Sequence, residues 1–256
     1  MFVVAAYLLL PIVAMVIFSF KDLAGKPSLA SWKAIFDQPD LKTSMVVSLE
    51  LVAIVIALVF FLVVPTVVWV HLKLPRLRRP LELICLLPLA IPGIVLVVGV
   101  ASIYRWISIH LTESPLMLAG VYSMLILPYT YRSLSAALHA VDVHTLSEAS
   151  RTLGASTYKM LSGIIMPSIR SGVMSGTVIS IALVLGEYTI SSILNYQTVQ
   201  VQISLIGQND GHIAVAISLA ALLFVFILLA IIPTTSNERR TVVDEPSPVL
   251  TPAVEA

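Results

Sequence analysis

Residues 44–70 read SMVVSLELVAIVIALVFFLVVPTVVWV, and their single charged side chain is Glu50. A helix crosses the hydrocarbon of a bilayer with about 20 mostly apolar residues, so this run is long enough to span a membrane. Of the 256 residues, 58% are apolar and 11% are charged, and the mean hydropathy is +0.99. Soluble domains have about 45–50% apolar and about 25% charged residues. The chain has too few charges to cover a surface that faces water, so we expect lipid to be its solvent.

Five more apolar runs lie on either side of this one, at residues 1–20, 84–104, 114–131, 171–186 and 213–237. The first begins abruptly at Met1 and lacks the basic lead and the small-residue cleavage site of a signal peptide, so we expect a retained span. The sequence therefore predicts an all-α membrane protein with about six transmembrane helices. They form one domain, residues 1–237, followed by a disordered cytoplasmic tail, residues 238–256, which is polar and rich in proline.

Lysine and arginine are distributed unequally between the two sides of this six-helix arrangement. One side carries ten: Lys73, Arg76, Arg78, Arg79, Arg132, Arg151, Lys159, Arg170, Arg239 and Arg240. The other side carries five: Lys21, Lys26, Lys33, Lys42 and Arg105. Because cytoplasmic loops carry the excess of basic residues, the first side is predicted to be cytoplasmic, together with both termini.

Residues 132–168 form the longest predicted cytoplasmic segment. Its first helix should begin near Thr145 or Ser147, with Glu148 in the first turn, where a negative charge suits the helix dipole. Gly154 suits the end of that helix. The segment continues with a second short helix.

This second helix should start after Ser156 as N-cap and run towards Ile165, and Pro167 marks the boundary where the chain re-enters the membrane. Short helices need tertiary support. We therefore expect this helix–turn–helix to bind another protein.

A spaced set of residues runs through the segment: Glu148-Ala149-Ser150, Gly154, Ile164 and Met166-Pro167. The set resembles the EAA loop of the permease subunits of ABC importers, in which E-A-A is followed at these spacings by G, I and L-P. Ser150 replaces the second alanine of that pattern and Met166 replaces the leucine. Pro88 and Ile91-Pro92 are similar to a proline pair common in these permeases.

The resemblance implies the type I ABC importer architecture and a coupling loop that sits in a cleft of a separate ATPase dimer. The implied coupling residues are Glu148, Ala149, Ser150, Leu153, Gly154 and Pro167. Small residues such as Ala149 and Ser150 would permit close approach, and Gly154 would allow the sharp reversal between the helices. Glu148 either pairs with a basic group of the ATPase or caps its own loop.

The resemblance also implies the partners and the location of the chain. Besides the ATPase, the implied partners are a second permease subunit in a heterodimer and an extracytoplasmic substrate-binding protein that faces the polar residues 195–210. The implied location is the lipid of a bacterial inner membrane.

The chain lacks the phosphate-binding pattern G-x-x-x-x-G-K-[ST], so we expect no enzyme activity and no cofactor of its own, with ATP and Mg on the partner ATPase. The net charge of +1 argues against nucleic acid, and the single cysteine, Cys85, excludes a disulfide framework or a cysteine metal cluster.

Acidic side chains inside the spans are candidates for the substrate path, because a buried charge is costly in lipid. Glu187 is the strongest of them and lies in Leu185-Gly186-Glu187-Tyr188-Thr189. This stretch resembles one in the polyamine, iron, thiamine and phosphonate branch of the permeases. Glu187, Tyr188 and Thr189 are therefore predicted to line the path or its gate, with an interfacial anchor as the alternative. Glu50 and Glu82 are further candidates, for which pairing with a nearby cation is the alternative.

Polyamines such as spermidine or putrescine are the predicted substrates, with iron, thiamine or an aminophosphonate as alternatives. A secondary transporter without an ATPase is the competing class of function, although nothing in that class predicts the EAA spacing. An intramembrane enzyme would need a motif such as H-E-x-x-H or G-x-S-x-G, and the sequence contains neither.

Overall fold

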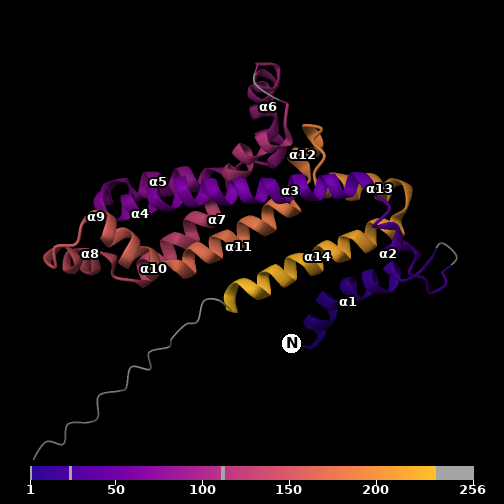
Figure 1. The fold of residues 1–256 in the computed structure, drawn as a ribbon, viewed down its shortest axis with the longest axis horizontal. Coiled ribbons are helices and arrows are strands. Elements are labelled where there is room, and N and C mark those ends of the chain that lie inside the picture. Colours follow the sequence, from indigo (N-terminus) through magenta and orange to yellow (C-terminus); the bar gives the residue numbers. More distant parts are fainter. Residues whose placement is uncertain (1, 23–24, 111–112, 235–256) are drawn as a thin grey trace, which may run out of the picture.

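The computed structural model describes residues 2–22, 25–110 and 113–234, and within these ranges the chain is helical apart from turns and one isolated β-bridge between Lys21 and Pro27 (Figure 1). The helices, with short 3-10 and π turns labelled η, are α1 (Phe2–Ser19), α2 (Ala30–Ala34), α3 (Pro39–Leu58), η1 (Val59–Val63), α4 (Val64–Lys73), η2 (Pro75–Leu77), α5 (Arg78–Leu86), η3 (Leu87–Ala90), α6 (Gly93–His110), η4 (Pro115–Met117), α7 (Leu118–Ala140), α8 (Val143–Thr152), α9 (Thr157–Met160), η5 (Leu161–Ile165), α10 (Met166–Ser168), α11 (Arg170–Gly186), α12 (Thr189–Ile193), α13 (Val199–Asn209) and α14 (Gly211–Thr234). The predicted all-α class is confirmed.

The longest element is one unbroken helix of 35 residues, Pro39–Lys73, which joins α3, η1 and α4. At 1.5 Å per residue it is roughly 50 Å long. The apolar run 44–70 lies wholly inside it. The π turn η1 ends at Val63, two residues before Pro65, which has no N–H to donate to the helical ladder.

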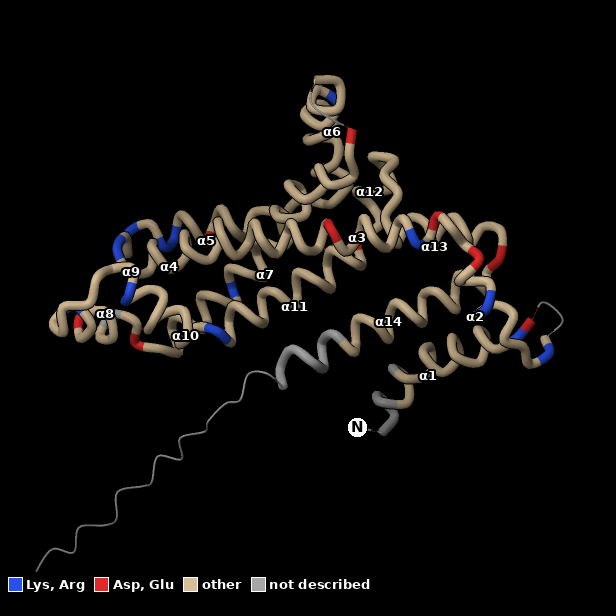
Figure 2. The backbone as a smooth tube through the Cα atoms, viewed as in Figure 1, with Lys and Arg blue, Asp and Glu red and all other residues tan. Residues whose placement is uncertain are grey.

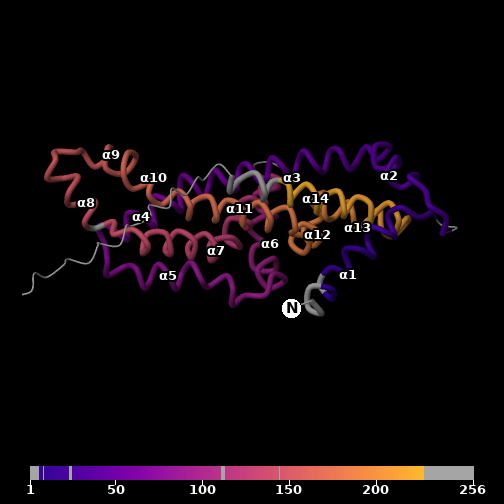
Figure 3. Tube along the Cα trace, turned by 90° about the horizontal axis from the view of Figure 1, so that it is seen from below, coloured from indigo at the N-terminus to yellow at the C-terminus, as the bar shows by residue number. Residues whose placement is uncertain are grey.

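The centre of the molecule is formed by α7 and α11, which pack along each other beside α3, while α7 also contacts α4 and α5 (Figures 1 and 3). A stripe of small residues on α11 makes this approach close, because Gly172 and Gly176 are both buried. A Cβ on Gly172 would lie 2.8 Å from the backbone oxygen of Ser133 in α7. The Ser133 hydroxyl donates to the Gly172 carbonyl at 2.9 Å. Small residues four apart allow such contact between membrane helices.

A second group of helices lies at the other end of the molecule, where α14 contacts α1, α2 and α13. The rings of Phe18 in α1 and His212 in α14 stack at 4.1 Å. A small apolar cluster of Leu41, Ile203, Ile206, Ala214 and Ile217 joins α3, α13 and α14. Through α13 this group is attached to the long helix.

Two predicted spans have different bounds in the structure. The predicted span 84–104 is wrong as a single helix, because the chain breaks between η3 and α6 at Ile91 and Pro92. Proline disfavours the helical conformation for the residue before it, and Ile91 is extended, with φ −101° and ψ 118°. The predicted span 114–131 continues as a helix to Ala140, so nine residues assigned to the loop belong to α7.

Among the described residues, three helices are long and apolar enough to cross a membrane: Pro39–Lys73, Gly93–His110 and Arg170–Ile193. Two shorter apolar helices, Leu9–Ser19 and Gly211–Ile227, belong to the predicted first and last spans. The total of six remains a prediction. Residues 235–256, with the predicted end of the last span and the tail, lie outside the described residues.

Candidate functional site

The predicted coupling loop is a compact helical unit at one end of the molecule (Figure 1). Its first helix, α8, begins at Val143, earlier than predicted, because Asp142 is the N-cap. The Thr145 backbone N–H donates to Asp142 Oδ1 at 3.2 Å. Glu148 therefore lies in the second turn, not the first, and the expectation that it meets the positive end of the helix dipole is wrong. Asp142, and not Glu148, caps the start of the helix, and the role of Glu148 in the loop stays a prediction.

Gly154 ends α8 in the left-handed region, with φ +77°. The Ala155 N–H donates to the Ser150 carbonyl and the Gly154 N–H donates to the Arg151 carbonyl, both at 3.0 Å. These two bonds form a Schellman motif, which satisfies the carbonyls at the helix end. A Cβ on Gly154 would meet nothing within 4 Å, so the backbone conformation, and not a lack of space, requires glycine here.

Ser156 caps the second helix as predicted, because its hydroxyl accepts a hydrogen bond from the Lys159 backbone N–H at 3.3 Å. From there α9, the π turn η5 and α10 run without interruption to Ser168. Pro167 is exposed and lies in α10, two residues after the π turn. The unit is therefore joined almost directly to α11.

Ser150 lies in the interior of the loop, and its part in ATPase coupling stays a prediction. It is 3% exposed, and it shares the inner face of α8 with Val143 and Ser147. The Ser147 hydroxyl lies 3.1 Å from the sulfur of Met160, which is buried in the second helix. The small side chain of Ser150 thus allows α8 to pack within the loop and against α4.

The outer face of the loop presents exposed side chains around the turn. Glu148, Ala149 and Gly154 are exposed, and Leu153 has 87% of its surface exposed. Tyr158, which the sequence interpretation did not select, is 78% exposed. Lysine and arginine lie on this end of the molecule, around α8–α10 and the turn between α4 and α5 (Figure 2). We call Leu153 and Tyr158 the tip of the loop.

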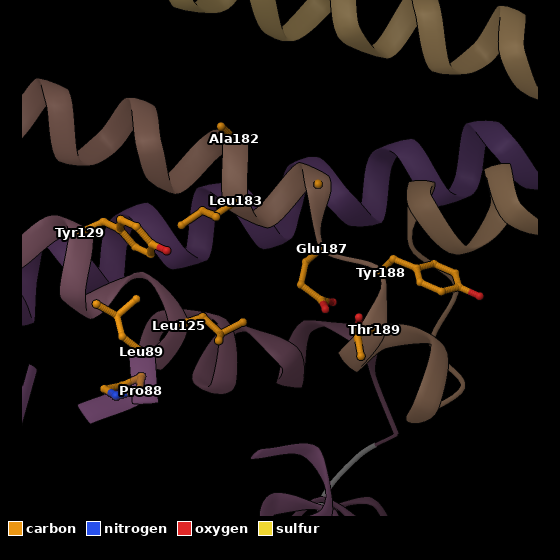
Figure 4. A pocket seen from close by; sticks show the side chains of 10 residues that line it. Pro88, Leu89, Leu125, Tyr129, Ala182, Leu183, Glu187, Tyr188 and Thr189 are labelled. Carbon is orange, nitrogen blue, oxygen red and sulfur yellow. The ribbon is translucent and has the colours of Figure 1, made fainter. Parts of the chain in front are cut away.

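The three predicted path residues lie together in the lining of a cavity of about 450 Å³. Its lining is Pro88, Leu89, Leu125, Tyr129, Ala182, Leu183, Gly186, Glu187, Tyr188 and Thr189 (Figure 4). The cavity thus lies where α11 ends, between α7 and the η3 turn. Glu50 and Glu82 are exposed on α3 and α5 and do not line it.

Glu187 occupies the break between α11 and α12, where its backbone is extended. Its Oε1 accepts a hydrogen bond from the Ile190 N–H at 2.8 Å, and its Oε2 accepts one from the Ser191 N–H at 3.3 Å. The hydroxyl of Tyr122 in α7 donates to Oε2 at 2.9 Å. The carboxylate therefore caps the first turn of α12, where free N–H groups favour negative charge.

The other two predicted path residues differ in their surroundings. The Tyr188 ring points away from the Glu187 carboxylate (Figure 4), and the Ser204 hydroxyl of α13 donates to the Tyr188 hydroxyl at 3.5 Å. Thr189 is exposed at the start of α12. Within residues 195–210, which are expected to face a binding protein, Gln197 and Gln208 are exposed, whereas Gln202 is buried and the Gln200 side chain donates to the Leu185 carbonyl at 3.0 Å.

Comparison with known families decides the class of protein. Residues 68–243 match the model of a family described as binding-protein-dependent transport system inner membrane component. The chain belongs to this family. It is therefore a multi-pass membrane permease of the ABC importer type, as the EAA spacing indicated.

The relatives of this permease are named for two different kinds of transported substance. The spermidine/putrescine transport system permease protein PotC of Haemophilus influenzae is 28% identical over 204 residues, which cover 76% of this chain and 77% of PotC. The molybdenum transport system permease protein ModB of Mycobacterium bovis is 28% identical over 233 residues, which cover 82% of this chain and 86% of ModB. ModB of Mycobacterium tuberculosis matches to the same extent.

Three features of the permease were missed from the sequence alone. The small-residue pattern Gly172-x-x-x-Gly176 was available as a signal for close helix packing. Tyr122 carried no local signal, because it lies 65 residues from Glu187 in the sequence. Tyr158 follows the motif glycine and had no place in the EAA pattern.

Proposed function

We propose that this permease forms the translocation path of an ATP-driven importer and is coupled to a separate ATPase by the loop of α8 and α9. The observation that carries the proposal is the tip, where two large apolar side chains are exposed on a loop whose own interior is packed. Exposed apolar groups of this kind mark protein–protein contacts. The surrounding cations make this end the proposed cytoplasmic end, because loops on that side are richest in lysine and arginine.

The connections of the loop supply a route for the coupling. Its first helix packs on α4, and its second helix continues through α10 to α11. The far end of α11 reaches Glu187 and the cavity. Movement of the loop with the ATPase would therefore displace α4 and α11 together, and the cavity lining would move with them. Such rocking about a central site is the general basis of alternating access.

A cationic substrate, with a polyamine as the first candidate, suits the cavity best. Among the described residues that line it, Glu187 is the only one with a formally charged side chain, and none is a lysine or arginine. The name of the PotC relative supports the same class. A molybdenum species is the second candidate because of the ModB relatives, and iron, thiamine and an aminophosphonate remain alternatives from the branch resemblance.

The proposed assembly contains this chain, a second permease subunit, the ATPase dimer and an extracytoplasmic substrate-binding protein. In such a system the binding protein commonly sets selectivity. Identification of the ligand held by that binding protein distinguishes a polyamine importer from a molybdenum importer.

Co-purification of the ATPase with tagged permease tests the coupling proposal. Leu153→Asp and Tyr158→Asp place a charge on the tip, and we expect each to reduce the recovered ATPase at least tenfold, because a buried unpaired charge is costly at an interface. Gln208→Asp is the control, since it adds the same charge at an exposed position of α13, at the other end of the long helix. Normal ATPase recovery with both tip variants would exclude the tip as the docking surface.

A further inference from the structure

The break between α11 and α12 is supported by polar groups on both of its sides. On the α11 side, Gln200 of α13 donates to the Leu185 carbonyl. On the α12 side, the Thr198 hydroxyl donates to the Ser191 hydroxyl at 3.0 Å, and Ser191 is fully buried. The Leu185 carbonyl at the end of α11 and the Ser191 hydroxyl in α12 are thus each bonded to a side chain of residues 198–200.

Tyr122 is the member of this network that comes from the central helix α7. Its side chain is 2% exposed, and its hydroxyl donates to Glu187 Oε2. This bond joins α7 to the break, whereas the bonds from Ile190 and Ser191 act only within the break. A hydrogen bond to an ionised carboxylate is about twice as strong as one between neutral groups.

The proposed transport function assigns the cavity to the translocation path, and the following inference rests on that function. We propose that Tyr122 is a positioning residue of the path. Its hydroxyl holds the Glu187 carboxylate on the first turn of α12 and thereby keeps residues 187–189 at the cavity wall. When the bond is lost, Glu187 is held by α12 alone, and the break can move away from α7.

A single-cysteine reporter measures this movement directly. Ile190→Cys, at a position whose side chain is fully buried in α12, is introduced into a Cys85→Ala background, because Cys85 is the only cysteine of the chain. Its rate of modification by a small polar thiol reagent is measured in membranes that contain the permease without ATPase and without substrate. We expect Tyr122→Phe to raise the rate roughly tenfold, the change in population that loss of one charge-assisted hydrogen bond permits. Glu187→Ala should raise it at least as much, because it removes the bond from Tyr122 together with the bonds from the Ile190 and Ser191 N–H groups.

A double variant and a control variant distinguish the positioning of Glu187 by Tyr122 from a general loss of helix packing. Tyr122→Phe combined with Glu187→Ala should label no faster than Glu187→Ala alone, because the Tyr122 hydroxyl then has no carboxylate to hold. Tyr104→Phe is the matched control: Tyr104 is also buried and donates its hydroxyl to a backbone carbonyl, that of Met117, at 2.7 Å. It should leave the labelling rate unchanged.

Three results would overturn the inference: an unchanged rate with Tyr122→Phe, an equal increase with Tyr104→Phe, or additive increases in the double variant. If Tyr122→Phe does not insert, Ser191→Ala weakens the same carboxylate site from the α12 side and should also speed labelling. The labelling needs no substrate and no ATPase. Its outcome is therefore separate from the co-purification result, which tests the proposed function itself.

Discussion

Gly154 shows how a single backbone angle determines the conformation of the loop of α8 and α9. The two hydrogen bonds of the Schellman motif form only with this residue in the left-handed region, where its φ is +77°. A side chain there meets no neighbour, so its cost is the conformation itself, about 1–2 kcal/mol for an ordinary residue. Asparagine visits this region more readily than other non-glycine residues.

We therefore predict a graded effect at this position. Gly154→Val should disturb the turn and reduce ATPase-coupled transport severalfold, whereas Gly154→Asn should retain most of it. The measurement is transport and ATPase co-purification in the same membranes. If Gly154→Val and Gly154→Asn are both inactive, glycine is required because a side chain would collide with a partner protein, and the backbone angle is not the reason.

Glu187 could be selected from the sequence, but its surroundings could not. A lone acid after an apolar run is visible in the chain, and the structure places it with Tyr188 and Thr189 at one cavity. Its partner Tyr122 is an ordinary tyrosine in another apolar run. Only the packing of α7 on α11 brings the two together, and a contact across 65 residues leaves no local pattern.

At the scale of helices, the apolar runs of the sequence predicted the positions of the helices well, but they predicted the first and last residues of the helices poorly. The runs 44–70 and 171–186 correspond to helices within the long helix and α11. The break at Ile91-Pro92 could have been predicted from the proline alone. The extension of α7 to Ala140 could not, because a protein-facing helix need not be apolar throughout, and residues such as Ser133 face α11 in place of lipid.

Close packing of α7 and α11 leads to a prediction for Gly172. Gly172→Ala should lower stability by about 1–3 kcal/mol, because the new Cβ would lie 2.8 Å from a backbone oxygen and 2.5 Å from the Cβ of Ala137. The apparent Tm of the purified permease measures this. Gly99→Ala in α6 is the control, since its Cβ would meet no atom within 4 Å.

A compensating change tests the geometry further. Ala137→Gly removes the contact at 2.5 Å but not that with the Ser133 backbone, so the double variant should recover part of the lost Tm. A Gly172→Ala protein with an unchanged Tm would mean that α7 and α11 lie farther apart than described.

At the scale of the whole molecule, the basic residues gather near the loop at one end and near α2 at the other (Figure 2). Orientation in the membrane can be tested with single cysteines in the Cys85→Ala background. We expect an impermeant reagent added outside to label Lys33→Cys and Gln197→Cys, both at exposed positions, but not Arg151→Cys or Lys159→Cys. The opposite pattern would invert the proposed topology, and labelling of all four in intact cells would contradict a single orientation.

The unbroken helix Pro39–Lys73 has a consequence for the membrane that surrounds the permease. At roughly 50 Å it exceeds a hydrocarbon thickness of about 30 Å, so it must lean or extend into the headgroups. One of its ends packs on α13 and the other on α8. A thicker bilayer would draw the helix upright and a thinner one would tilt it, and both ends would shift together. Lipid chain length is therefore expected to act on this permease much as an effector does, by changing the energy difference between its conformations.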